Sequence, residues 1–197
     1  MKKILFFIVK RLPSNYLRIL FYKIFFKYKI GRSVKIGKSI INAKKVIIGD
    51  NVLIRDNNHI SCNVLKIEKN VSIHSGNRIM GTADFSIGEN SRIINNHFID
   101  LYNNVVIGKN SWLAGKNSQI WTHGSVSTKL GKNLDVVVGD NVYIGSNVSI
   151  APGVKIVDVN LVGLGTVVTQ SFMKPKTIII GNPSKVVKED IDWRKDW

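Results

Sequence analysis

Residues 138–156 read VGDNVYIGSNVSIAPGVKI and contain the repeat that decides the fold. An aliphatic residue returns at every sixth position, and the series continues beyond this stretch: Val138, Ile144, Ile150, Ile156, Val162 and Val168. A period of six fits neither a helix of about 3.6 residues per turn nor a long strand with strict alternation. It predicts a solenoid of short strands and turns, in which every sixth side chain enters a narrow core.

The same repeat extends through most of the chain and begins near residue 36. Its usual form is an aliphatic residue followed by Gly, a variable residue and Asn; Gly and Asn readily adopt the left-handed backbone that tight corners need. Aliphatic residues 19 or 20 positions apart indicate coils of about 18 residues with small corner insertions. These residues are Ile48, Ile67, Ile87 and Ile107. We therefore predict an all-β solenoid, a parallel β-helix, over residues 34–187. The spacing alone does not give its hand.

The N-terminal segment, residues 1–33, lacks this repeat and is both basic and apolar. Its apolar residues recur at helical spacing, which predicts two short amphipathic helices. Basic residues keep each apolar run below the length of about 18 residues that spans a bilayer, and no small-residue cleavage site follows as in a signal peptide. Two interpretations stay open: residues 1–30 dock on an anionic membrane, or they only cover the end of the solenoid.

Charge and cysteine content limit the partners and the compartment. The chain carries 29 Lys and Arg against 13 Asp and Glu, a formal net charge of +16, and residues 1–30 contain no acidic residue. The remaining cations are spread along the repeats without the compact patch of a nucleic-acid-binding protein, so we expect no nucleic-acid partner. Cys62 is the one cysteine, which excludes a disulfide framework within the chain and favours the cytoplasm.

The repeat is interrupted at residues 120–125, IWTHGS. Regular units resume at Val138, and residues 126–136 are rich in the residue types of loops. Insertions in a solenoid project from one corner and often carry function. His123 is therefore expected on the coil surface beside this loop, where a neutral imidazole is suited to accept a proton near pH 7.

Three other histidines precede this interruption. We interpret His59 and His74 as corner residues bonded to the backbone, whereas His97 remains open between a corner residue and a site residue. Successive histidines are separated by 15, 23 and 26 positions, unlike the closely spaced ligands of a three-histidine metal site. The sequence therefore predicts no metal site.

Three features together resemble the hexapeptide-repeat acyltransferases: the iterated [LIV]-G-x-N-[VS]-x units, IGSNVSIAPGV at residues 144–154, and IIIGNPSKVV at residues 178–187. The resemblance implies a left-handed parallel β-helix, a homotrimer with active sites between subunits, and acetyl-CoA as the acyl donor. IWTHGS is similar to the corresponding segment of bacterial sugar O-acetyltransferases of surface-polysaccharide pathways. The resemblance assigns the role of general base to His123.

Other site residues follow from the resemblance position by position. In INNHFIDL, residues 94–101, it places acceptor-binding residues at Asn96 and Asp100, to within one position. His97 is the further acceptor-binding candidate in this segment. Trp121 is expected either to wall the acceptor pocket or to brace the corner. The cofactor-binding positions that it implies are Tyr143, Ser146, Leu164, Thr169, Lys174, Lys176 and Pro183.

The chain departs from the family pattern at three of its positions. Leu164 replaces a usual small Ala, and Gln170 replaces a usual Lys, so Lys174 or Lys176 is expected to contact the donor phosphates instead. Gly124 stands where some relatives carry an acidic residue beside the base. A backbone carbonyl is therefore expected to orient His123, although Asp100 remains an alternative for this role.

We predict an acetyl-CoA-dependent O-acetyltransferase that modifies a sugar hydroxyl of a surface glycan, such as an O-antigen, capsule or exopolysaccharide precursor. The alternative is N-acetylation of a nucleotide-linked amino sugar with the same base and donor. A carbonic-anhydrase-type metal enzyme and a noncatalytic scaffold fit the residues less well. The expected location is the cytoplasm, with peripheral contact to the inner face of the plasma membrane. The tail, residues 188–197, is expected to pack Trp193 and Trp197 on the solenoid or on a neighbouring subunit.

Overall fold

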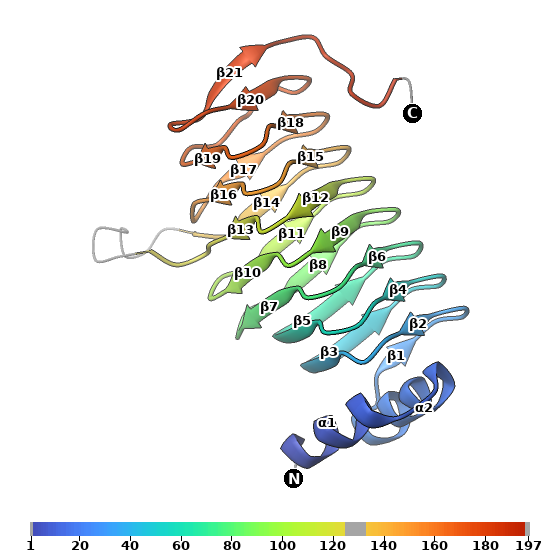
Figure 1. The fold of residues 1–197 in the computed structure, drawn as a ribbon. Helices are drawn as coiled ribbons and strands as arrows, with labels where there is room; N and C mark the ends of the chain where they lie inside the picture. The colour runs from blue at the N-terminus through green and yellow to red at the C-terminus, as the bar shows by residue number, and fades with distance from the viewer. Residues whose placement is uncertain (1, 125–132, 196–197) are drawn as a thin grey trace.

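The computed structural model describes residues 2–124 and 133–195 as two helices followed by a parallel β-helix. The helices, α1 (Lys2–Arg11) and α2 (Asn15–Phe26), cover one end of the stack of coils, and the C-terminal segment lies at the other end (Figure 1). The fold class expected from the six-residue repeat is confirmed. Within the described residues, no helix is both long enough and apolar enough to cross a membrane.

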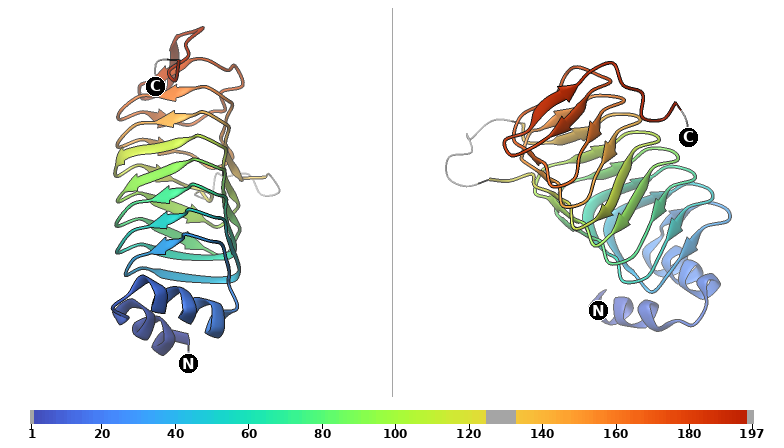
Figure 2. Two further views of the ribbon diagram at one scale, coloured as in Figure 1. Left: turned by 90° about the vertical axis from the view of Figure 1, so that its right-hand side faces the viewer. Right: turned by 45° about the horizontal axis from the view of Figure 1, so that its top comes forward.

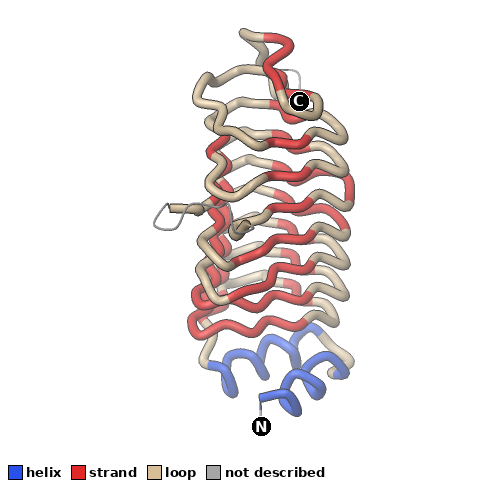
Figure 3. The backbone as a smooth tube through the Cα atoms, turned by 90° about the vertical axis from the view of Figure 1, so that its left-hand side faces the viewer, coloured by secondary structure: helices blue, strands red, loops and turns tan. Residues whose placement is uncertain are grey.

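Successive coils add strands to three faces (Figure 2, Figure 3). The first face contains β1 (Lys29–Ile30), β8 (Phe85–Ile87), β11 (Val105–Ile107), β14 (Val136–Val138) and β17 (Lys155–Ile156). The second face contains β2 (Lys35–Ile36), β4 (Leu53–Ile54), β6 (Ser72–Ile73), β9 (Arg92–Asn95), β12 (Trp112–Lys116), β15 (Tyr143–Ile144), β18 (Leu161–Val162), β20 (Ile178–Ile180) and β21 (Lys185–Lys188). The third face contains β7 (Arg78–Gly81), β10 (Phe98–Leu101), β13 (Gln119–Ile120), β16 (Ser149–Ile150) and β19 (Val167–Val168).

Two long strands, β3 (Ile40–Ile48) and β5 (His59–Ile67), run from the third face into the first. The neighbouring strands pair in parallel, except that β20 and β21 are antiparallel. We name the corners by the faces that they join. The chain passes the first corner from the first face to the second, the second corner from the second face to the third, and the third corner from the third face back to the first.

The six-residue period forms the core, as expected. Each residue of the series that begins at Val138 and ends at Val168 is at most 2% exposed. The more widely spaced isoleucines also align, because Ile48 pairs with Ile67 and Ile87 pairs with Ile107 across neighbouring strands of the first face. The core is therefore a continuous stack of aliphatic side chains from successive coils.

Asparagines at the first corner supply the left-handed backbone that the sharp turn requires. Asn51, Asn70, Asn90 and Asn110 have φ between 54° and 60°. Their side-chain amides also bond from coil to coil, with Nδ2 of one residue donating to Oδ1 of the next at 3.0–3.2 Å. The recurring Asn thus turns the chain and joins neighbouring coils.

The interruption of the repeat lies at the third corner, between β13 and β14. Ile107 pairs with Val138, 31 positions later, whereas Val138 pairs with Ile156, 18 positions later. Of the loop expected at residues 126–136, residues 126–132 lie outside the described part of the chain. The expected end of this loop is too late, because Val136 already belongs to β14.

The helix α2 is fixed to the first coil by hydrogen bonds. Ser14 caps its start, with Oγ accepting from the Leu17 amide at 3.2 Å. Arg18 Nε donates to the Ile36 carbonyl at 2.8 Å, and the Tyr22 hydroxyl donates to the Ser39 carbonyl at 3.0 Å. The helices therefore cover the end of the solenoid, which leaves membrane docking of their other side open.

The described part of the tail crosses the second face. The Trp193 ring centroid lies 5.9 Å from that of Trp112 and 5.4 Å from that of Tyr143. Its Nε1 donates to the Asn141 carbonyl at 2.7 Å. Trp193 thus packs on the solenoid, while Trp197 lies outside the described residues.

Candidate active site

A histidine and a carboxylate from neighbouring coils meet at the third corner, at the interruption of the repeat. Asp100 lies near the end of β10, and His123 follows β13, which pairs with β10 in parallel. The Nδ1 atom of His123 lies 2.8 Å from Asp100 Oδ2. The His123 side chain is 47% exposed and that of Asp100 is 12% exposed, so the imidazole is open to ligands while its partner is largely covered.

Thr122 holds this carboxylate in place. Its amide donates to Asp100 Oδ2 at 3.0 Å, and its hydroxyl lies 2.7 Å from the same oxygen. Thr122 is fully buried and also binds the next corner residue, because its Oγ1 accepts from the Asn103 amide at 2.9 Å. Neither Thr122 nor Asn103 was expected at the site. The register of β10 and β13 continues to Trp121 opposite Asp100, and Thr122 is the next residue along the chain.

The environment keeps Asp100 ionised. Burial raises its pKa, but hydrogen bonds from Thr122 and His123 outweigh burial and hold the pKa below its ordinary value. An ionised carboxylate can only accept hydrogen bonds, so neutral His123 must carry its proton on Nδ1. Nε2 is then the basic nitrogen. This arrangement is suited to taking a proton from a ligand and to stabilising the imidazolium that forms.

Asp100, rather than a backbone carbonyl, therefore contacts the nitrogen that orients the imidazole. The expectation drawn from Gly124 is wrong, and the alternative assigned to Asp100 is the one that the structure shows. The acidic partner lies 23 positions before the histidine instead of beside it in the chain.

Aromatic side chains flank His123. The Trp121 ring meets the imidazole edge-on at 5.8 Å between centroids, and the Tyr102 ring lies at 5.5 Å. Trp121 also packs on Phe98, with 5.0 Å between ring centroids, so it both braces the corner and borders the imidazole. Tyr102 is 70% exposed, and its sequence position gave no indication of a site residue. Flat exposed rings beside a base are suited to bind a sugar face.

Two of the acceptor-binding residues expected from the sequence lie away from His123. Asn96 and His97 precede β10 at the second corner, whereas Asp100 and His123 lie at the third. His97 is 1% exposed, and its Nδ1 accepts from the Ser118 amide at 3.0 Å. The expectation that His97 contacts the acceptor is therefore wrong: its imidazole satisfies a buried backbone group. Asn96 adopts a left-handed corner conformation with φ of 57°.

The cofactor-binding positions fall into separate places in one chain. Thr169 is exposed at the third corner, after β19, which lies two strands from β13 on the third face. Ser146 and Leu164 lie at the second corner, and Leu164 is 73% exposed. Tyr143 lies on the second face under Trp193, so it is covered by the tail instead of lining an open site.

Not all of the residues expected to contact the donor phosphates are free to do so. Lys174 forms an ion pair with Glu189 at the surface, which raises the pKa of the Lys174 ammonium. Lys176 is exposed at the first corner, in a left-handed conformation. Pro183 is exposed in the turn between β20 and β21. One chain therefore does not bring these three residues to His123.

The remaining histidines are isolated from one another. Burial and neighbouring arginines lower the pKa of both His59 and His74. Over residues 2–124 and 133–195, no three His, Cys, Asp or Glu side chains are placed to hold a metal ion.

The fold and the site define a class: a parallel β-helix with an oriented histidine at the corner where its repeat is interrupted. No family model matches the chain. The galactoside O-acetyltransferase of Escherichia coli is 30% identical over 136 residues, which are 66% of this chain and 64% of that protein. The chain thus spans less than two thirds of the length of the curated relatives that it matches first.

Solved structures of O-acetyltransferases share this fold. A polysialic acid O-acetyltransferase, OatWY, superposes with a TM-score of 0.66 at 25% identity, over 86% of this chain and 88% of that one. A maltose O-acetyltransferase from Clostridium difficile shares the fold, with a TM-score of 0.51 at 23% identity, over 95% of this chain and 83% of that one. The chain is therefore similar in sequence to a galactoside O-acetyltransferase and similar in fold to acetyltransferases built from hexapeptide repeats, and sugar O-acetyltransferases are among the proteins that it matches.

Proposed function

We propose that this protein is an acetyl-CoA-dependent O-acetyltransferase that acts on a sugar hydroxyl of a surface glycan, on the cytoplasmic side of the membrane. The single observation that carries the proposal is the His123–Asp100 pair at the interruption of the repeat, with Nδ1 and Oδ2 2.8 Å apart. The sugar O-acetyltransferases among its relatives support the reaction class. The aromatic rings of Tyr102 and Trp121 beside the imidazole support a sugar as the acceptor.

The chain's own residues supply the proton transfer. A sugar hydroxyl is a weak nucleophile until a base takes its proton, and His123 Nε2 performs this role. Asp100 stabilises the imidazolium, and Thr122 keeps Asp100 in place through two contacts to one oxygen. His123 then returns the proton to the departing thiolate sulfur, so no proton is gained or lost overall. Acetyl-CoA, when bound, supplies the thioester carbonyl that receives the hydroxyl oxygen.

The described residues fit this donor in part. Leu164 is exposed, and a Cβ built on its neighbour Gly165 would meet nothing within 4 Å, so this corner offers an open apolar surface to a pantetheine arm. Ser146 Oγ lies at the same corner, where it accepts from the Lys116 amide at 3.2 Å. Lys176 is the candidate phosphate contact, because Lys174 is already paired with Glu189.

We further propose a homotrimer with sites between subunits. In one chain, Leu164 and Ser146 lie at the second corner and His123 at the third, on opposite edges of the third face. A site built by two subunits lets residues of both corners contact one donor. Sedimentation measures the trimer directly. Mixing His123→Ala and Leu164→Asp subunits should restore activity that neither variant shows alone.

The proposed function is tested by thiol release from acetyl-CoA in the presence of four acceptor classes: free sugars, nucleotide sugars, lipid-linked oligosaccharides and polymers. Wild-type protein should release thiol with at least one of them, and His123→Ala should lose this activity while keeping its circular dichroism spectrum and assembly. Wild-type turnover in His123→Ala would overturn the assignment of the base. Acetylation of an amine on a nucleotide-linked sugar, identified by mass spectrometry of the product, would replace the O-acetyltransferase with an N-acetyltransferase.

A further inference from the structure

The two N-terminal helices carry apolar side chains on the side that faces away from the solenoid. On α2, Arg18 and Tyr22 are buried against the first coil. The opposite side of the helix carries Leu17, Leu20 and Ile24, which are 39%, 39% and 59% exposed. Because these three residues are spaced by three and four positions, they form one continuous stripe.

The helix α1 repeats this arrangement. Phe6 and Val9 are buried, whereas Ile4 and Ile8 are 64% and 39% exposed on the other side. Phe7 is 58% exposed and borders a cavity between α1 and the solenoid. Both helices therefore cover the solenoid with one side and leave apolar side chains of the other side in water. Exposure of such a stripe to water does not stabilise the protein, and contiguous exposed apolar patches mark contact surfaces.

The positive charge of the N-terminal helices indicates which kind of partner the apolar stripe contacts. The printed sequence has no acidic residue before Asp50, and Lys10, Arg11 and Lys23 are exposed on the helices. A second copy of the chain docked by the same surface would bring like charges together. An anionic bilayer offers both requirements at once: an apolar interior for the stripe and negative headgroups for the cations.

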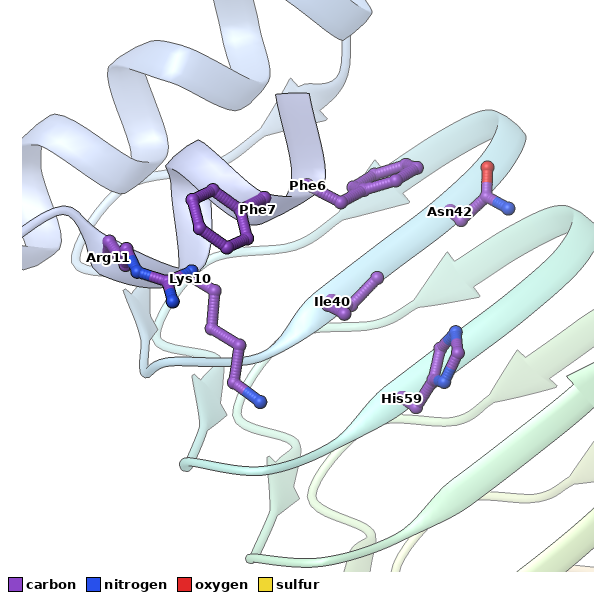
Figure 4. A pocket seen from close by; sticks show the side chains of 7 residues that line it. All are labelled: Phe6, Phe7, Lys10, Arg11, Ile40, Asn42 and His59. Atoms are coloured by element: carbon purple, nitrogen blue, oxygen red, sulfur yellow. The ribbon is translucent and has the colours of Figure 1, made fainter. Parts of the chain in front are cut away.

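A cavity beside α1 also combines apolar walls with basic side chains. It has a volume of about 580 Å³, and its walls come from α1 and from the starts of β3 and β5 (Figure 4). Phe6 and Phe7 give it apolar walls, and Lys10 and Arg11 lie at its helical side. His59 stands across from them on β5 (Figure 4), and burial together with the charges of Arg78 and Lys10 lowers its pKa. An apolar cavity beside cations is suited to an anionic amphiphile.

We propose that α1 and α2 form a membrane-docking cap that binds the surface of an anionic bilayer through the apolar stripe and its flanking cations. Figure 1 shows the cap at one end of the solenoid. The strand that precedes His123, β13, lies four strand spacings beyond β3 on the third face, which is about 19 Å. The base therefore lies about this far from the first coil, on which the cap packs. If the proposed function holds, docking of the cap would bring the base near the membrane, and we infer that the acceptor is a glycan carried on a membrane lipid.

Vesicle co-sedimentation of the full-length protein tests the cap without relying on activity. We expect binding to phosphatidylglycerol-containing vesicles, and much weaker binding to pure phosphatidylcholine vesicles. Leu20→Asp with Ile24→Asp should lower binding at least about tenfold, because two apolar side chains no longer enter the bilayer. Lys10→Glu with Lys23→Glu should lower binding to the anionic vesicles by a similar factor, and raised salt should weaken binding by the wild type.

Matched controls lie elsewhere on the chain. Met173→Asp changes an equally exposed apolar residue at the far end, and Lys109→Glu changes an exposed cation of the solenoid, so both should bind like the wild type. Wild-type protein that stays in the supernatant, or cap variants that bind as well as the wild type, would overturn the proposal. Concentration-dependent self-association that Leu20→Asp with Ile24→Asp abolishes, without vesicle binding, would assign the stripe to a second copy. Thiol release with a soluble acceptor should be unchanged in the cap variants, so docking and the proposed function can fail separately.

Discussion

The role of Asp100 can be isolated by one substitution, Asp100→Asn. Three contacts use a single carboxylate oxygen: the Thr122 amide at 3.0 Å, the Thr122 hydroxyl at 2.7 Å and His123 Nδ1 at 2.8 Å all meet Oδ2. The amide oxygen of Asn can occupy this place and accept the same three bonds. The substitution therefore preserves the geometry and removes the negative charge that stabilises the imidazolium.

The magnitude follows from the exposure of the pair. The equivalent change in a buried serine-protease triad lowers kcat about ten-thousandfold. Here the His123 side chain is 47% exposed, so water replaces much of the lost stabilisation. A charge-assisted hydrogen bond exceeds a neutral one by about 1–2 kcal/mol. We therefore expect kcat to fall about 5- to 30-fold, since 1.36 kcal/mol corresponds to about tenfold in rate.

The assay is thiol release from acetyl-CoA with the acceptor found in the panel described above. kcat should fall while KM for the acceptor stays constant, because Asp100 contacts the base and not the sugar. Asp100→Ala is the comparison. It also leaves the buried Thr122 amide without its acceptor, so it should lose more activity and about 1–3 kcal/mol of stability. An unchanged kcat with raised KM in Asp100→Asn would refute the orienting role and return Asp100 to acceptor binding.

Two further predictions concern the fold. Burial lowers the pKa of His97 from 6.5 to about 4, so between these values the unfolded chain binds a proton that the folded chain excludes. The free energy of unfolding should therefore decrease by about 3 kcal/mol as pH falls through this range, measured by urea unfolding. His97→Gln should lack this part of the pH dependence, and equal slopes in both proteins would contradict the assignment. Ile150→Ala should lower the free energy of unfolding by about 2–5 kcal/mol, because Ile150 is 1% exposed in the core, whereas Val106→Ala, at 39% exposed, should lower it by less than about 1 kcal/mol.

The six-residue period predicted the solenoid because the burial of a side chain depends on its position within its own coil. Each core residue is set by its position within its own repeat, so Val138 and Ile144 could be placed in the core without knowledge of any other coil. The interruption that holds His123 was found in the same way, as a failure of the local pattern. The helices were likewise predicted from their own spacing.

Contacts between coils could not be predicted with the same certainty. Paired strands of neighbouring coils are offset by 17 to 21 positions, and by 30 or 31 across the interruption, because each corner insertion adds to the offset. An error of one position moves a side chain to the other side of its strand. This is why the sequence left Asp100 open between orienting His123 and binding the acceptor. It is also why the buried His97 was included among the acceptor-binding residues.

The amino-acid sequence by itself determined the β-helix, the position of its interruption and the basic, apolar character of the N-terminal segment, since each depends on residues close together in the chain. Only the tertiary structure decided that Asp100 orients His123, that Trp193 covers Tyr143 from 50 positions away, and that α2 buries Tyr22 while exposing Ile24. These features depend on which distant segments pack together. That packing is fixed by the summed register of the coils and by the segments that fold over them, neither of which a local repeat contains.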